Sequence, residues 1–180
     1  LRNGNFVRQP QVSILVTQVR GNQASVLGMV NRPGRYPIEQ TGMRLSELLA
    51  TAGGIAQGGS DLVTLIGIRD GRPLRVVIDL PNLFTASAKT NDPVISNGDT
   101  VYVDRMPMVY IYGEVQRPGA MRLEREMTVI QALATGGGLT QRGTEKGLRV
   151  HRRNADGKVE ILQPGMNDPM KDGDVIYVRE

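Results

Sequence analysis

Apolar and polar residues alternate in short runs along most of this 180-residue chain. Alternation with a period of two predicts β-strands that bury one face, and the stretches 11–17, 101–103 and 176–178 show it clearly. Apolar residues recur at helical spacing in two short stretches, 45–52 and 129–133. The pattern therefore predicts an α+β chain that is mostly strand, with short helices.

The same order of elements occurs twice. The stretch VLGMVNRPGRYPIE at 26–39 matches IYGEVQRPGAMRLE at 111–124 with an offset of 85 residues. The helical stretch that follows repeats with an offset of 84, whereas the last stretch, NDPVISNGDTVYV at 91–103, matches NDPMKDGDVIYV at 167–178 with an offset of 75. The fall from 84 to 75 means that the second copy lacks nine residues, which we place around 80–90. Copies of this size predict two small domains in tandem rather than a solenoid.

The repeat also sets the expected boundaries. The two copies meet near 105–107, so the predicted domains are 25–106 and 107–180. Residues 1–24 have no counterpart in the second copy, and they contain the strand pattern at 11–17. We therefore expect this segment to be a strand of a preceding domain.

Turn signals stand at matching places in both copies. Because proline presets φ and glycine accepts a positive φ, the Arg-Pro-Gly triplets at 32–34 and 117–119 predict type II turns within hairpins. Gly-Asp pairs precede the last strand of each copy, and we expect their carboxylates to accept hydrogen bonds from turn N–H groups. These predicted turn residues are Pro33, Gly34, Pro118, Gly119, Gly98, Asp99, Gly173 and Asp174. The dipeptides Asp-Gly at 70–71 and 156–157 predict further hairpins.

The two helices carry start and stop signals. Thr128 and Gln131 fit a capping box, whereas in the first copy Arg44 is a poor N-cap and Glu47 keeps the partner type at the third position. Both helical stretches end in runs of glycine, as helix termination prefers.

Composition narrows the classes of function. The chain has no cysteine and a single histidine, His151, so thiolate chemistry is excluded and a histidine-based metal site or triad would depend on one residue. The glycine runs follow helices and fit neither GxGxxG nor a P-loop, which argues against a nucleotide site. No catalytic residue, metal or cofactor is predicted. No apolar run approaches the length of a membrane span, and the sequence begins at Leu1 without a signal segment, so we expect a fragment or a mature piece.

Net charge is +4, too small to indicate nucleic acid. The strongest basic cluster lies at 142–153, opposed by a single carboxylate, Glu145, and it consists of Arg142, Lys146, Arg149, Arg152 and Arg153. Because arginine forks suit carboxylates and phosphates, we hypothesise that this cluster meets an acidic polymer or an acidic patch on a neighbouring subunit; an ordinary solvated face is the alternative. Arg32 and Arg117 recur in both copies and are further candidates for binding, unless they are solvated beside the turns.

The order of elements in each copy resembles the SLBB repeat, the soluble-ligand-binding β-grasp domain. That order is a strand, Arg-Pro-Gly, a second strand, a helix ending in AGG or GGG, and a closing strand GDTVYV or GDVIYV. Two such repeats after PQVSILVTQVR at 10–20 resemble outer-membrane polysaccharide export proteins of the Wza type, whose export domain ends in a strand of the PxVSV kind. The resemblance implies two tandem β-grasp-like domains with one short helix each, preceded in 1–24 by the last strand of a polysaccharide-export domain.

The same resemblance implies a function. Full-length relatives form ring-shaped homo-oligomers in the periplasm, export capsular or extracellular polysaccharide through the outer membrane, and work with an inner-membrane copolymerase that is often a tyrosine autokinase. The chain is then a non-enzymatic periplasmic segment that forms conduit wall and subunit contacts, with outer-membrane association supplied by parts outside this sequence. The alternative is a stand-alone glycan or small-ligand binding module, which needs a concave pocket with converging polar groups. An enzyme is disfavoured because no nucleophile and base can be named, and a redox module lacks a cofactor motif.

Overall fold

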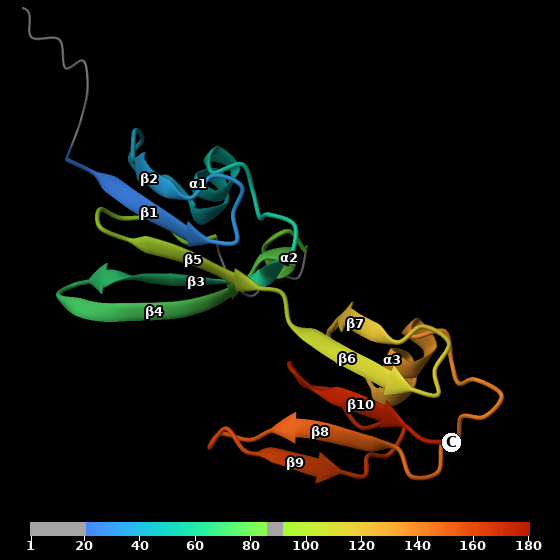
Figure 1. The fold of residues 1–180 in the computed structure, drawn as a ribbon. Helices are drawn as coiled ribbons and strands as arrows, with labels where there is room; N and C mark the ends of the chain where they lie inside the picture. Colours follow the sequence, from blue (N-terminus) through green and yellow to red (C-terminus); the bar gives the residue numbers. More distant parts are fainter. Residues whose placement is uncertain (1–20, 86–91) are drawn as a thin grey trace, which may run out of the picture. The chain divides into compact units, whose positions relative to one another are not determined.

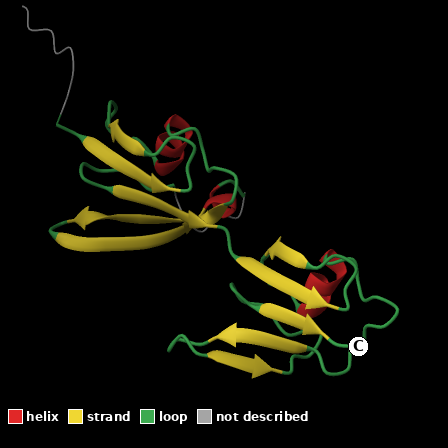
Figure 2. Ribbon diagram, in the orientation of Figure 1, coloured by secondary structure: helices red, strands yellow, loops and turns green. Residues whose placement is uncertain are grey.

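The computed structural model describes residues 21–85 and 92–180, and these divide into two compact units. The first unit holds the described residues up to Ile55 together with Leu62–Val103, and the second holds Ala56–Asp61 and Asp104–Glu180. Each unit has a five-stranded sheet and a short helix of seven residues (Figures 1 and 2). The predicted α+β class, with two similar, mostly stranded domains, is confirmed. The strand predicted at 11–17 lies outside the described residues, as does nearly all of the predicted end of a preceding domain.

The first unit is a mixed sheet covered by a helix. Its strands lie in the order β2-β1-β5-β3-β4. The central pair β1 and β5 is parallel, whereas β1–β2 and β3–β4 are antiparallel hairpins. Its elements are β1 (Gln23–Gly28), β2 (Gly34–Pro37), α1 (Leu45–Thr51), β3 (Gly59–Arg69), β4 (Arg72–Asp79), α2 (Leu80–Leu83) and β5 (Thr100–Arg105).

The second unit repeats this topology strand for strand. Its order is β7-β6-β10-β8-β9, again with a parallel central pair, β6 and β10, flanked by antiparallel neighbours. The short helix α2 of the first unit falls in the stretch that the repeat comparison marks as missing from the second copy. The elements are β6 (Met108–Gly113), β7 (Gly119–Arg122), α3 (Val129–Thr135), β8 (Arg149–Arg153), β9 (Val159–Leu162) and β10 (Val175–Val178).

Alternation along the strands sorts side chains between two faces of each sheet. The inward residues pack with the helix into one aliphatic core per unit. In the first core Leu45 and Leu48 of α1 and Val101 of β5 are fully buried, and in the second core Val129 and Ile176 are. Because each core is complete within its own half, the halves are two folds rather than one shared interior.

Local signals in the sequence set the helix starts and one tight hairpin. The Gln131 side chain accepts a hydrogen bond from the Thr128 backbone N–H at 2.9 Å, and Glu47 accepts the matching bond from Arg44 at 3.1 Å, as predicted. Asp70 and Gly71 join β3 to β4 with φ of 50° and 74°, the two positive values that a type I′ turn requires.

The type II turns predicted at Arg-Pro-Gly are wrong. Gly34 lies outside the left-handed region, and Gly119 has a φ of 148°, far from the roughly 80° of a type II turn. The left-handed glycine instead ends the preceding strand, at Gly28 (φ 87°) and Gly113 (φ 93°). A Cβ at these two positions would lie 2.0 and 2.1 Å from a carbonyl oxygen of the neighbouring parallel strand. The close approach of two strand backbones therefore requires glycine at the end of the strand before the triplet, and not at the triplet itself.

Candidate functional site

A buried carboxylate lies at the start of the last strand of each unit. Asp174, fully buried, accepts hydrogen bonds from Arg152 of β8, Nε to Oδ1 at 2.8 Å and Nη2 to Oδ2 at 2.6 Å. The N–H of Lys171 in the preceding turn also donates to Oδ2 at 2.8 Å, the type of bond expected from the Gly-Asp turn. Asp174 is therefore satisfied and serves the fold rather than a ligand.

The first unit holds the same kind of ion pair, built from a different strand position. Asp99 accepts from both terminal nitrogens of Arg69, at 2.8 and 2.7 Å, and from the N–H of Ser96 at 2.8 Å. Gly67 makes room for it, since a Cβ there would lie 2.1 Å from Asp99 Oδ1. The hydrogen bonds to the aspartates raise the pKa of Arg69 and of Arg152, against a smaller opposing effect of desolvation. Both guanidinium groups thus stay charged at any workable pH.

Arg32 and Arg117 turn out to hold the ends of helices. Arg32 donates from Nη2 to the carbonyl of Thr51 at 2.9 Å, and Arg117 donates to Thr135 at 3.0 Å, each at the last residue of its helix. A cation at a helix C-terminus also meets the negative end of the helix dipole. These arginines therefore have a structural role at the helix ends, and their proposed role in binding stays a prediction.

The structure divides the basic cluster predicted at 142–153. Arg152 is committed to Asp174, Arg142 pairs with the carboxylate of Glu180, and Arg153 donates from Nη1 to the carbonyl of Gly157 at 2.9 Å. Lys146 and Arg149 are exposed, and their side chains have no hydrogen-bond or ion-pair partner within the ranges 21–85 and 92–180. Arg142 and Arg152 are thus held in ion pairs, whereas Arg153, also exposed, uses only one nitrogen for a turn carbonyl; the binding role of the cluster stays a prediction.

Strand register brings Arg149 beside aromatic residues that the sequence did not connect with it. On the outward face of the second sheet, Tyr177 of β10 is the cross-strand neighbour of Tyr112 on one side and of Arg149 on the other. The two tyrosine rings lie 4.8 Å apart between centroids and are tilted by 31°. A second row places Tyr110 and His151 on either side of β10.

We call this surface the tyrosine–arginine face. The outward positions of β6, β8, β9 and β10 carry no carboxylate. Tyr110 and Tyr112 are 44% and 42% exposed, so their rings are open to a partner. The face consists of Met108, Tyr110, Tyr112, Arg149, His151, Arg153, Val159, Ile161, Val175 and Tyr177.

The first sheet presents a different outward face on the same topology. Its register pairs Leu27 with Tyr102 where the second sheet pairs two tyrosines. Ile68 and Val77 are 69% and 59% exposed. We call the apolar residues of this surface the aliphatic face; the same side of the sheet also carries Arg75 beside Ile66 and Arg35 beside Ser25. The aliphatic face consists of Leu27, Leu62, Ile66, Ile68, Val77 and Tyr102.

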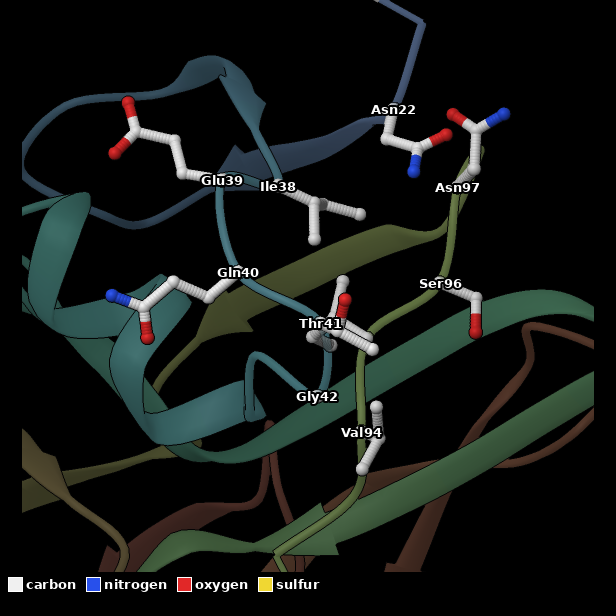
Figure 3. Close-up of a pocket in the computed structure, with 10 residues that line it drawn as sticks. Asn22, Ile38, Glu39, Gln40, Thr41, Gly42, Val94, Ser96 and Asn97 are labelled. Carbon is white, nitrogen blue, oxygen red and sulfur yellow. The ribbon is translucent and has the colours of Figure 1, made fainter. Parts of the chain in front are cut away.

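A shallow pocket of about 420 Å³ lies in the first unit, between the segments 38–42 and 94–97. Figure 3 shows Asn22 and Asn97 close together at one end of it, while the side chains of Glu39 and Gln40 point away from them. Asn97 already accepts a hydrogen bond from the backbone N–H of Gln23 at 3.0 Å. Few free polar groups therefore converge in this pocket.

Two further observations concern metal ions and membranes. Across the described parts of the chain, no three His, Asp or Glu side chains are grouped so that they would hold a metal ion. None of the helices in those parts combines the length and the apolar content that a membrane crossing requires.

Comparison with protein families identifies both units. One model described as an SLBB domain matches residues 22–103, and a second model, also described as an SLBB domain, matches residues 108–163. Together the two matches cover most of the chain; the first falls in the first structural unit apart from Ala56–Asp61, and the second falls in the second unit.

Comparison with curated proteins gives relatives over nearly the whole chain. The EPS I polysaccharide export outer membrane protein EpsA of Ralstonia nicotianae is 28% identical over 96% of this chain and 48% of its own length. EpsA of Ralstonia solanacearum is 27% identical, with 96% and 49% covered. The Vi polysaccharide export protein VexA/TviF of Salmonella typhi is 26% identical, with 98% and 54% covered. The chain therefore spans about half the length of the curated relatives it matches.

Proposed function

We propose that this chain, which belongs to the Wza-type family of outer-membrane polysaccharide export proteins, is a non-enzymatic periplasmic segment of a polysaccharide export channel. It carries two SLBB domains of that family in tandem. In this role it supplies conduit wall and contacts between subunits of a ring-shaped homo-oligomer. The observation that carries the proposal is the alignment of 96–98% of the chain to export proteins. An inner-membrane polysaccharide copolymerase is the further partner that the proposal includes.

The architecture of each unit suits a wall. In each unit the strands are joined in one mixed sheet and covered by a helix. An ion pair between a buried aspartate, Asp99 or Asp174, and an arginine adds a further link within the unit. Rigid walls with modest contacts suit transport, because a polymer that is held tightly at many points would not move. A wall of this kind needs no reactive group.

The aliphatic face of the first unit supports contact between subunits. Large exposed apolar surfaces on a soluble domain mark interfaces more often than bare solvent-facing surface. A second copy of the chain is the occupant expected in an oligomeric wall, since a conduit buries such faces between neighbours. Ile68, at 69% exposure, and Val77, at 59%, would be covered in that assembly.

Two measurements on the full-length protein test the proposal. Light scattering should give the mass of an oligomer, and the protein should restore polysaccharide export to a host that lacks it. Replacement of both Ile68 and Val77 by Thr should lower the mass, whereas Val159→Thr, at a valine of similar exposure (55%) in the second unit, is the control. A full-length protein that is monomeric, or a deletion host that exports normally, would contradict the conduit.

The alternative, a stand-alone binding module, draws on the pocket in Figure 3. Calorimetry with neutral oligosaccharides distinguishes the two functions. A discrete site with micromolar affinity that is lost when Thr41→Phe fills the pocket would favour the module. Absence of such a site would leave the conduit as the better account.

A further inference from the structure

We propose that the tyrosine–arginine face binds an acidic polysaccharide, with the tyrosine rings against sugar rings and the arginines paired with sugar carboxylates. The inference rests on the proposed function for the presence of a polysaccharide, and it adds the chemical class of the polymer and the surface that meets it. Neither follows from membership of the family. Both come from which side chains the second sheet brings to one face.

The geometry of the face fits an extended ligand. Tyr112, Tyr177 and Arg149 form a row across the three neighbouring strands β6, β10 and β8. At about 4.8 Å between strands, the row spans roughly 10 Å of surface. The two rings pack against each other at a tilt of 31°, so the pair offers apolar ring surface with hydroxyl groups at its rim. Arg149, at the end of the row, is the group that would meet a charge on the ligand.

The electrostatics of the face select an anion. Arg149, His151 and Arg153 occupy every second position of β8, all on the outward side, and the outward positions of β6, β9 and β10 add no carboxylate to balance them. Arg152, between them, points to the opposite side and is neutralised by Asp174. The positive charge is therefore concentrated on the same side as the tyrosines. Guanidinium groups recognise carboxylates through paired hydrogen bonds.

A glycan fits this face better than an acidic protein surface does. Charge alone would serve either partner, but the adjacent open tyrosine rings supply stacking surface that sugar rings use and carboxylate side chains do not. An uncharged glycan would use the tyrosines and leave Arg149 without a partner. Tyrosine and arginine in one row thus point to a sugar polymer that carries acid groups.

The first unit provides an internal contrast. Its sheet has the same strand order, yet Leu27 stands in the register position of Tyr112, and β3 presents Thr64, Ile66 and Ile68 outward. The fold therefore does not require a tyrosine pair in this row or arginines on the strand that corresponds to β8, since the outward arginines of the first sheet, Arg35 and Arg75, stand on its edge strands β2 and β4. Arg35 and Arg75 are exposed arginines of the first sheet and supply a control of equal charge.

Binding of the 180-residue chain to three immobilised polymers tests the inference: polygalacturonate, uncharged dextran and polyglutamate. Polygalacturonate should bind the wild type best, with an affinity that falls as salt is raised. The double variant Arg149→Gln and Arg153→Gln should weaken that binding by about tenfold or more, the worth of one charge-assisted hydrogen bond. The matched variant Arg35→Gln and Arg75→Gln should change it less than about twofold, as removal of exposed charges outside the binding face does.

A second variant separates stacking from charge. Tyr112→Leu copies the residue that the first sheet carries at the same place, so the fold should tolerate it. It should weaken binding to polygalacturonate and leave binding to polyglutamate unchanged. Circular dichroism and the unfolding midpoint confirm that each variant is folded.

Every other outcome overturns the inference. Equal losses in both arginine pairs would mean that the face only attracts polyanions in general. Polyglutamate binding as tight as polygalacturonate would mean a contact with an acidic protein surface. The proposed function is tested separately. If full-length protein restores export while the variants bind like wild type, only the proposal for the tyrosine–arginine face is wrong. If export does not depend on the protein, the conduit proposal is wrong, whatever the chain binds.

Discussion

Removal of the guanidinium that faces Asp174 should destabilise the second unit strongly. In Arg152→Met the side chain keeps its apolar stem but loses both bonds to the carboxylate, which are 2.8 and 2.6 Å long. Leaving a buried charge without its partner costs ~3–5 kcal/mol. Because the Arg152 side chain is 24% exposed, water replaces part of the lost interaction, and we expect about 2–4 kcal/mol.

Arg149→Met is the matched control. It makes the same chemical change on the same strand, three residues away, but on an exposed side chain outside any ion pair that the described residues form. Its effect on the free energy of unfolding should stay below about 0.5 kcal/mol. The difference between the two variants isolates the ion pair from the general loss of a positive charge.

Hydrogen exchange during urea titration is the assay, because it reports each unit separately. Amides of β8 and β10 should open at lower urea in Arg152→Met, while amides of the first sheet keep their wild-type stability. Adding Asp174→Asn removes the stranded charge and should recover part of the loss, by about 1 kcal/mol or more. If Arg152→Met costs no more than Arg149→Met, or if the double variant is worse than the single one, the buried pair does not stabilise the fold as reasoned.

Three further changes test other parts of the structure, each by its shift in the urea midpoint. Arg117→Ala removes the bond to the Thr135 carbonyl and should cost about 0.5–1.5 kcal/mol, seen as weaker exchange protection of α3. Gly113→Ala should cost about 3 kcal/mol or more, because its Cβ would meet the β10 backbone, whereas Gly173→Ala, with φ of 79° and open space around it, should cost only about 1 kcal/mol. Ile176→Ala, at a fully buried site, should cost about 2–5 kcal/mol and leave the first unit unchanged.

Sequence alone predicted the features that depend on neighbours along the chain. The repeat, the Asp70–Gly71 turn, the reach of Gln131 back to Thr128 and the two aliphatic cores all follow from local patterns, and the structure contains them. These features depend on propensity, capping and alternation, which act over a few residues.

Features that depend on strand register were missed. The Arg152–Asp174 and Arg69–Asp99 pairs join residues on neighbouring strands, and the two arginines stand at different distances from the following Asp-Gly turn. No shared sequence motif identifies the two ion pairs. Arg152 stands opposite Asp174 at the start of the neighbouring strand, whereas Arg69 reaches Asp99 past Gly67. The type II turns predicted at Arg-Pro-Gly were wrong, and the triplets gave no sign of the contact between strand backbones that requires glycine at Gly28 and Gly113.

Duplication allows folding and function to be separated within one chain. Both units keep the order of strands in the sheet, the arginine at the helix end and the buried aspartate. Both also keep an ion pair to that aspartate, although Arg69 and Arg152 occupy different positions along their strands. These shared features are what the fold needs. The outward faces differ: exposed apolar residues dominate one, and tyrosine with arginine the other. Because side chains alternate along a strand, both faces lie on the side of the sheet that points away from the core. Since folding does not require this difference between the faces, our proposals assign them different partners, a second copy of the chain to the aliphatic face and an acidic polysaccharide to the tyrosine–arginine face.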